Sequence, residues 1–302
     1  MAILITRPGK NALYVQNPVM TAAGSFGWGH TYRGLVETDK LGAIVTNPIT
    51  VQPWSPASGT RVVPLPGGVL VHTGLPNRGL RRVLKEFSTV WSSLPVPLIA
   101  HLVATDAAEV RSAAVELDHA ESVAGIELGL PDDLEWQAAS DLVRAATQGA
   151  PEKPVIVRLP AGDALAIAAA VADAGADALV VAAPPRGIAR DRGSGQLVRG
   201  RVYGPLVKPI ALHLLATLHE TLRGIPLIGA GGIHDPQDAR DFIEAGAVAV
   251  QVDSLLWTQP NRINRIARDL GGGIVTRRMD AFPDEWHADM GDTEFRRRFG
   301  DE

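Results

Sequence analysis

Eight short apolar runs recur along the chain, and longer stretches with helical spacing of apolar residues separate them. Each run is nearly continuous in apolar character, which is typical of parallel strands that are buried on both faces. The predicted strands are 19–24, 42–47, 98–104, 125–130, 154–160, 178–183, 226–232 and 249–254. Helices are predicted between them, for example over 106–119, 133–148, 163–174, 208–223 and 235–245.

This alternation predicts a (β/α)₈ TIM barrel, because such a barrel needs eight strand–helix units in about 250 residues. An open, doubly wound sheet is the alternative. Asp106 and the pair Asp235–Pro236 are typical helix starts. We expect one domain over 1–270 and a polar tail over 271–302, since no long polar linker interrupts the chain.

Two insertions interrupt the regular pattern. Residues 48–77 are rich in Pro, Gly and Val and predict a hairpin after the second strand, and residues 184–207 form a long loop after the sixth. Both follow the carboxyl ends of strands, where the active sites of such barrels are built. The insertions therefore point to the end of the barrel that should carry function.

Composition narrows the function classes. Apolar residues make up 46% of the chain and charged residues 21%, so a large core can form, and the net charge of −4 gives no general attraction for nucleic acid or anionic lipid. The chain has no cysteine, which excludes disulfides, thiolate nucleophiles and iron–sulfur clusters. No apolar run approaches the ~20 residues of a membrane span, and the first ten residues lack a signal-peptide core. We expect a cytoplasmic protein without a membrane partner. No motif has the residue spacing of a metal-binding site, so no metal is expected.

Glycine-rich segments end the last two predicted strands. Residues 229–233 read Gly-Ala-Gly-Gly-Ile, and residues 250–254 read Val-Gln-Val-Asp-Ser. Glycines let backbone N–H groups approach a phosphate, and the loops after strands 7 and 8 form the usual phosphate site of such barrels. The segments indicate a phosphorylated cofactor or substrate, although ligand-free tight turns would give the same pattern. Asp253 would repel a phosphate unless its carboxylate points away.

Six segments together carry a family resemblance. They are 17–27 (NPVMTAAGSFG), 41–46 (LGAIVT), 74–77 (GLPN), 186–187 (RG), 204–212 (GPLVKPIAL) and 228–233 (IGAGGI). In this order and spacing they resemble the dihydroorotate dehydrogenases, which are FMN-dependent barrels of pyrimidine biosynthesis. The resemblance extends from residue 17 to about residue 254. It implies an oxidoreductase activity, FMN as the cofactor and a possible homodimer.

The resemblance also assigns roles to individual positions. The residues implied to bind FMN are Ala22, Ala23, Gly24, Arg158, Gly204, Gly231, Gly232 and Ser254. The loop implied to cover the substrate contributes Gly74, Leu75 and Asn77.

Several positions depart from the family pattern. Asn47 stands where the family has a lysine that touches flavin and substrate, and Arg158 replaces a lysine near the pyrimidine end of the flavin. A guanidinium keeps the positive charge that can stabilise a reduced flavin. Tyr203 replaces a serine next to Gly204. Three positions lose the asparagine amides that bind the pyrimidine ring, namely Val71, Gly129 and Ala183. Each lost pairing costs ~1–3 kcal/mol, which argues against efficient oxidation of dihydroorotate.

The proton acceptor is also altered. The loop after the fourth strand reads Leu-Pro-Asp-Asp over 130–133 and lacks the family's Cys or Ser base. Asp132 is a candidate replacement, although it and Asp133 would also suit an N-cap of the next helix. His101, inside the third strand, would either contact the ligand or serve the structure. Arg186, the first of five arginines in the insertion 184–207, is expected to hold an acidic substrate, unless this loop is a solvated lid.

These observations predict a divergent dihydroorotate dehydrogenase-like FMN oxidoreductase for a small anionic substrate, with dihydroorotate as the nominal one. Its catalytic residues would be Asp132, Arg158 and Asn47. A flavin-free, non-catalytic barrel that serves as a binding or partner subunit is the alternative, and Tyr203 and Asp253 favour it. A third possibility is a non-redox barrel enzyme for a phosphorylated substrate.

Overall fold

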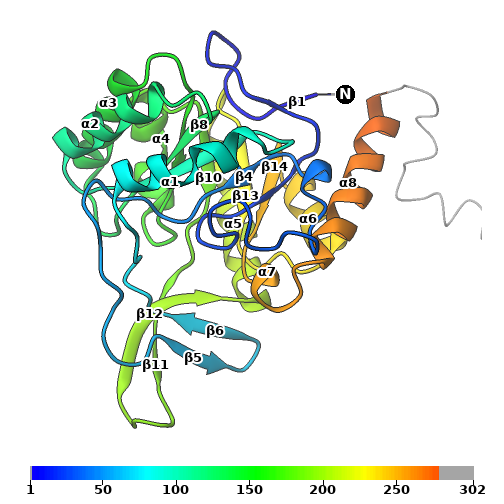
Figure 1. Cartoon of the computed structure of the whole chain (residues 1–302). Helices are drawn as coiled ribbons and strands as arrows, with labels where there is room; N and C mark the ends of the chain where they lie inside the picture. The colour runs from blue at the N-terminus through cyan, green and yellow to red at the C-terminus, as the bar shows by residue number, and fades with distance from the viewer. Residues whose placement is uncertain (1, 279–302) are drawn as a thin grey trace, which may run out of the picture.

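A computed structural model of the protein describes residues 2–278. All eight predicted strands form one parallel sheet, in the order β3-β14-β13-β10-β9-β8-β7-β4. The strands are β3 (Val19–Thr21), β4 (Ile44–Val45), β7 (Leu98–Val103), β8 (Gly125–Gly129), β9 (Val155–Arg158), β10 (Ala178–Val181), β13 (Leu227–Ala230) and β14 (Ala249–Val252). The sheet is wrapped by helices (Figure 1), which confirms the predicted (β/α)₈ barrel.

The helices alternate with these strands as the pattern predicted. They are α1 (Leu80–Ser92), α2 (Ala107–Asp118), α3 (Trp136–Gly149), α4 (Ala164–Asp173), α5 (Lys208–Thr221), α6 (Pro236–Glu244), α7 (Leu255–Thr258) and α8 (Arg262–Arg278), with two short 3₁₀ turns, η1 (Thr38–Lys40) and η2 (Pro205–Val207). Asp106 accepts hydrogen bonds from two backbone N–H groups of α2, and Asp235 forms a capping box with Asp238 at α6. Both predicted helix starts are therefore correct.

The barrel closes between its first and second strands. The N–H of Gly42 donates to the carbonyl of Val19 at 2.8 Å, and the N–H of Thr21 donates to that of Ala43 at 3.3 Å. A side chain at position 42 would place its Cβ 2.0 Å from the carbonyl oxygen of Asn17. This seam therefore requires glycine on steric grounds.

Gly42→Ala is expected to destabilise the fold by about 1–3 kcal/mol, the range for overpacked sites. The clash is with backbone, which cannot rotate away as a side chain can. Gly162→Ala is the matched control, because nothing lies within 4 Å of the Cβ it would add. Urea unfolding followed by circular dichroism measures both variants, and equal stability of the two would contradict the steric assignment.

The barrel interior is apolar at its amino-terminal end. Alternate residues of the strands, among them Met20, Ile99 and Ile228, form an inner cluster with no more than 2% exposure. A small antiparallel pair, β1 (Ile3–Leu4) and β2 (Tyr14–Val15), packs onto this cluster. A second and larger cluster lies between the strands and the surrounding helices. The amino-terminal end is thus filled, and the opposite end remains for a site.

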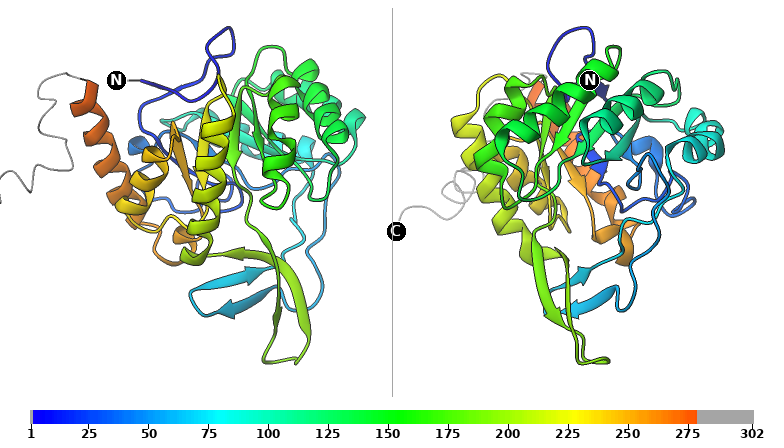
Figure 2. Two further views of the ribbon diagram at one scale, coloured as in Figure 1. Left: turned by 180° about the vertical axis from the view of Figure 1, so that it is seen from behind. Right: turned by 90° about the vertical axis from the view of Figure 1, so that its left-hand side faces the viewer.

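The two insertions combine into one structure at that opposite end. Residues 48–77 contain the hairpin β5 (Val62–Leu65) and β6 (Gly68–Val71), and residues 184–207 contain β11 (Arg186–Arg190) and β12 (Leu197–Tyr203). They pair as an antiparallel sheet in the order β11-β12-β6-β5. This sheet projects from the barrel in every view (Figures 1 and 2). The second insertion is therefore a paired hairpin, which the sequence did not indicate.

The carboxyl-terminal part of the described chain is the helix α8, which continues past residue 270 to Arg278. The rest of the predicted polar tail, residues 279–302, lies outside the described residues. Within residues 2–278, no helix combines the length and the apolar character needed to cross a bilayer.

Candidate active site

A cavity of about 460 Å³ opens at the carboxyl ends of the barrel strands, next to the projecting sheet. We call it the mouth cavity. Its lining contains seven residues that the sequence assigned to a site, namely Ala22, Ala23, Gly24, Asn47, Leu75, Asp132 and Arg158. It also contains Val71, Gly129 and Ala183, the three positions where the family resemblance implies asparagines. Residues far apart in sequence thus meet around one cavity, at the place that the barrel fold predicts.

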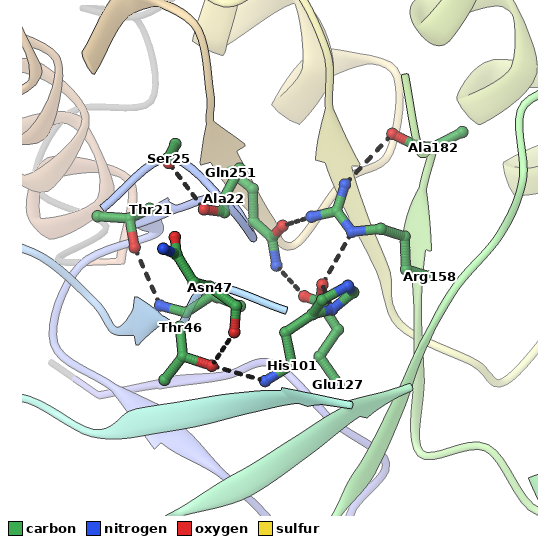
Figure 3. Close-up of polar contacts among 11 residues, drawn as sticks. Thr21, Ala22, Ser25, Thr46, Asn47, His101, Glu127, Arg158, Ala182 and Gln251 are labelled. Atoms are coloured by element: carbon green, nitrogen blue, oxygen red, sulfur yellow. Dashed lines mark hydrogen bonds and ion pairs between the residues drawn. The ribbon is translucent and has the colours of Figure 1, made fainter. Parts of the chain in front are cut away.

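A buried polar layer forms the floor of this cavity (Figure 3). The Nε of Arg158 donates to Oε1 of Glu127 at 2.8 Å, and its Nη2 donates to Oε1 of Gln251. The Nε2 of Gln251 donates to the other Glu127 oxygen at 2.6 Å. The three side chains form a closed ring of hydrogen bonds contributed by β9, β8 and β14. The ring fixes the guanidinium where Arg158 reaches the cavity.

Charge in this layer is balanced. Glu127 is fully buried and Arg158 is 6% exposed. Burial alone would raise the pKa of Glu127, but the positive charge of Arg158 outweighs it and holds the pKa well below its usual range. The carboxylate therefore stays ionised at neutral pH and compensates the cation.

His101 lies beside this pair and reaches the cavity. Its Nδ1 is 2.9 Å from Oε1 of Glu127, although the ring is not aligned for a hydrogen bond. Its other side faces Gly129, where an added Cβ would lie 3.0 Å from Nε2 and 2.8 Å from Cε1. The imidazole thus needs the space left by the missing side chain at position 129. A larger side chain at position 129 would therefore displace the His101 ring.

Asn47 contributes an unsatisfied polar atom. Its side-chain Oδ1 is buried and has no hydrogen-bond partner within residues 2–278. Its backbone carbonyl accepts from the Oγ1 of Thr46 at 2.9 Å. Because a buried acceptor without a partner costs free energy, such an atom beside a cavity indicates a ligand N–H or a water.

Asp132 and Asp133 are bound by arginines of the projecting sheet. Arg201 donates to both oxygens of Asp132, and Arg186 donates to both oxygens of Asp133 at 2.7 Å. The helix α3 begins only at Trp136 and has no side-chain cap within the described chain, so the interpretation of these aspartates as an N-cap is wrong. The two pairs instead fasten the hairpin β11–β12 across the mouth cavity.

A second pocket of about 650 Å³ adjoins the mouth cavity under the projecting sheet. Gly74 and Leu75 line it, as does Arg186. Asn77 has a different environment, because its Oδ1 accepts from the N–H of Gly79 at 2.9 Å and it is 9% exposed. Asn77 therefore shapes the loop within the structure, whereas the other three face open space.

The glycines that the sequence expects at a phosphate pack closely together. A Cβ on Gly232 would lie 2.5 Å from the backbone N of Lys208 and 2.9 Å from the carbonyl of Gly204. The backbone at Gly231 and Gly232 has positive φ angles of 116° and 72°. The described residues that line the mouth cavity do not include these glycines or Ser254, but they do include Asp253.

Asp253 lies between the cavity and Ser254. Its Oδ1 accepts from the N–H of Ser254 at 2.5 Å and from the Oγ of the same residue at 3.0 Å. His234 approaches from the loop after β13, with Nε2 3.1 Å from that Oγ. The carboxylate thus occupies both donors of Ser254, a residue that the sequence analysis expects at a phosphate.

Sequence reasoning missed Glu127, Gln251 and Arg201 as site residues. The sequence did contain a signal for Glu127, because it is the single carboxylate in an otherwise apolar strand. A carboxylate buried in such a strand needs a partner. The sequence contained no such signal for Arg201, because it does not show which of the five arginines in the insertion 184–207 reaches the barrel. Among the described residues, no group of three or more His, Cys, Asp or Glu side chains is arranged to hold a metal ion.

The chain is similar in sequence to known proteins over most of its length. The sequence model of the family described as dihydroorotate dehydrogenase matches residues 11–273. Three similar relatives are each named dihydroorotate dehydrogenase B (NAD(+)), catalytic subunit. The chain is 32% identical to that of Citrifermentans bemidjiense (88% of this chain, 92% of the relative), 33% to that of Geobacter sp. strain M21 (85% and 88%) and 34% to that of Pelobacter propionicus (85% and 90%).

Proposed function

Because this chain belongs to the dihydroorotate dehydrogenase family, we propose that it is a flavin oxidoreductase that acts on a small anionic substrate at the mouth cavity. The observation that carries this proposal is the Arg158 guanidinium, fixed at the cavity floor by Glu127 and Gln251. A rigid cation at the carboxyl end of a barrel strand is suited to stabilise negative charge that develops on a bound ring.

The enzymes of this family are FMN-dependent flavoproteins, in agreement with the cofactor expected from the sequence. The cavity volume is within the range of ligand sites, roughly 300–1,000 Å³. The orphaned Oδ1 of Asn47 offers an acceptor for a ring N–H, and the small residues 22–24 leave space for a planar ring. When bound, FMN supplies the acceptor for a hydride removed from the substrate.

The substrate is proposed to be a small carboxylate that is less polar along its ring than a pyrimidine. Val71, Gly129 and Ala183 line the cavity without an amide group. A substrate with several ring amides would leave those amides unpaired. Arg201 lines the same cavity, and Arg186 lines the adjoining pocket, so both can face a carboxylate.

His101 is proposed as the proton acceptor. The Glu127 carboxylate beside Nδ1 favours a proton on that nitrogen, which leaves Nε2 as the accepting atom. Asp132 also lines the cavity, but both its oxygens accept from Arg201. We therefore propose that Asp132 holds Arg201 in place for the substrate.

The test is a visible spectrum of the purified protein, before and after addition of FMN and desalting. We expect retained bands near ~450 nm and slow or no bleaching by dihydroorotate under anaerobic conditions, with faster bleaching by a member of a panel of cyclic and short-chain carboxylates. His101→Gln should retain the flavin but bleach about 10²–10⁴-fold more slowly, the usual contribution of a general base.

Each part of the proposal has its own contradictory outcome. A colourless protein that fails to hold FMN would exclude the oxidoreductase and would favour the non-catalytic barrel, or a non-redox enzyme if a sugar phosphate raises the melting temperature. Rapid bleaching by dihydroorotate would overturn the proposed substrate class. Unchanged bleaching by His101→Gln would remove His101 as the proton acceptor.

A further inference from the structure

The carboxylate of Asp253 is placed where an anion would be expected. It follows β14, which is the strand whose end, with that of β13, provides the phosphate site of such barrels. Asp253 is 5% exposed and lines the mouth cavity. Its Oδ1 accepts from both the backbone N–H and the hydroxyl of Ser254. A phosphate bound here would otherwise accept hydrogen bonds from these two groups.

The groups that face Asp253 come from four elements. Ser254, at the start of α7, binds the carboxylate, and His234 from the loop after β13 contacts Ser254. Arg158 of β9 and Tyr203 of β12 line the same cavity and interact with Asp253 electrostatically. Arg158 is already committed to Glu127 and Gln251. Among these described side chains, the only other possible cation is therefore His234, when its imidazole is protonated.

The charge states of these neighbours are set by burial. Burial raises the pKa of Asp253 and, together with the Asp253 charge, raises the pKa of Tyr203 to about 12. Burial lowers the pKa of His234, against the opposing charges of Asp253 and Asp238 and with the charge of Arg262 adding to the decrease. Tyr203 stays a neutral phenol, and His234 is mostly neutral at neutral pH. The surroundings of Asp253 therefore offer little positive charge to a second anion.

We propose that Asp253 competes with the flavin phosphate for the N–H and hydroxyl of Ser254 and thereby sets how much the phosphate contributes to cofactor binding. The inference rests on the proposed function, because it takes the ligand of the mouth cavity to be a flavin. An ionised Asp253 next to a phosphate is repulsive, whereas the acid form can donate its proton to a phosphate oxygen. FMN must therefore either displace the carboxylate from Ser254 or bind with Asp253 protonated.

The consequence is a selectivity that can be measured with two flavins. Riboflavin has the same ring and ribityl chain as FMN but no phosphate, so it reports the ring site alone. In this chain the ratio of FMN to riboflavin affinity is expected to be small near pH 8 and to increase as Asp253 becomes protonated. Asp253→Asn keeps the shape of the side chain and removes its charge, and Asp253→Gly removes the side chain.

The experiment measures both dissociation constants by quenching of flavin fluorescence, with flavin-free protein, near pH 6 and near pH 8. We expect Asp253→Asn and Asp253→Gly to raise the FMN-to-riboflavin ratio about tenfold or more near pH 8, where a full carboxylate–phosphate repulsion is relieved. The difference between the natural chain and Asp253→Asn should shrink as the pH falls and Asp253 takes up a proton. The FMN phosphate also takes up a proton near pH ~6, which weakens its repulsion by Asp253 in the natural chain alone, so the comparison near pH 8 carries the test.

The outcomes separate the two levels of inference. Riboflavin binding that is equal in all three proteins shows that the variants are folded and that the ring site is intact. An unchanged FMN-to-riboflavin ratio in both variants would then overturn the role of Asp253 while leaving the flavin site in place. Failure of all three proteins to bind either flavin would overturn the proposed function, and this inference with it.

Discussion

Replacing Glu127 with alanine is expected to lower the free energy of unfolding by about 3–5 kcal/mol, the usual cost of breaking a buried ion pair. The substitution leaves the Arg158 guanidinium, which is only 6% exposed, without its counter-charge. It also removes an acceptor from the side-chain amide of Gln251. Urea unfolding at pH 7, followed by circular dichroism, measures the change.

An exposed ion pair provides the control. Glu116 accepts from Arg81, whose side chain is 88% exposed, so Glu116→Ala is expected to cost no more than about 1 kcal/mol. The double variant Glu127→Gln/Arg158→Met removes both buried charges and should recover part of the lost stability. If Glu127→Ala were no more destabilising than Glu116→Ala, the buried network would not be the structural element inferred here.

The same carboxylate makes stability depend on pH. Because the pKa of Glu127 is lower in the folded protein than in the unfolded chain, its contribution is fully present above the unfolded pKa of about 4.3. The contribution is lost as the pH falls below that value towards the folded pKa. Glu127→Gln should therefore reduce the slope of stability against pH in the acid range, with the same unfolding assay as the measurement.

Replacing Arg158 with methionine is expected to slow reduction of the bound flavin by about 10²–10³-fold, as when one stabilising donor is removed from an active site. The guanidinium is the cation held at the cavity floor, and methionine keeps much of its length without the charge. Anaerobic stopped-flow absorbance near ~450 nm measures the rate with the carboxylate that bleaches the flavin. The midpoint potential of the bound flavin, which needs no substrate, should become more negative.

Arg158→Lys is the matched variant, since it keeps the charge but loses the planar fork that binds Glu127 and Gln251 together. In Arg158→Lys, the midpoint potential of the bound flavin should stay close to that of the natural protein. The rate of flavin reduction should fall much less than in Arg158→Met. Because Arg158→Met leaves Glu127 unpaired, the double variant with Glu127→Gln is measured beside it to separate lost chemistry from lost folding. Equal potentials in Arg158→Met and Arg158→Lys would show that the charge at this position does not act on the flavin.

The arrangement of strands and helices could be predicted because its signals are local. A continuous apolar run indicates a buried strand wherever it occurs, and Asp106 and Asp235 can cap their helices through groups two or three residues away. The hairpin β11–β12 could not be predicted, since it is stabilised by pairing with β6, more than a hundred residues earlier. Its arginines gave only a charge pattern.

The candidate site was predictable only in part for the same reason. Arg158 and Asn47 were found because they stand where the resembled family has lysines, and both line the mouth cavity. Asp132 was predicted as a replacement base, but its partner, Arg201, lies in the distant insertion 184–207. The role of Gly129 became clear only from the structure, because the His101 ring occupies the space that a side chain at position 129 would need.

By itself, the sequence determined the succession of eight strand–helix units, the helix starts and the end of the barrel that would carry the site, because these depend on residue type and short-range spacing. Only the tertiary structure decided which charges meet. Glu127, Arg158 and Gln251 come from three strands that the barrel brings into one layer, and there a carboxylate and a guanidinium become a neutral buried pair. The role of Asp253 likewise depends on the fold, since its carboxylate binds the donors of Ser254 while it lines the mouth cavity. The interaction of two charges depends on their distance in space, and the spacing of residues along the chain does not reveal that distance.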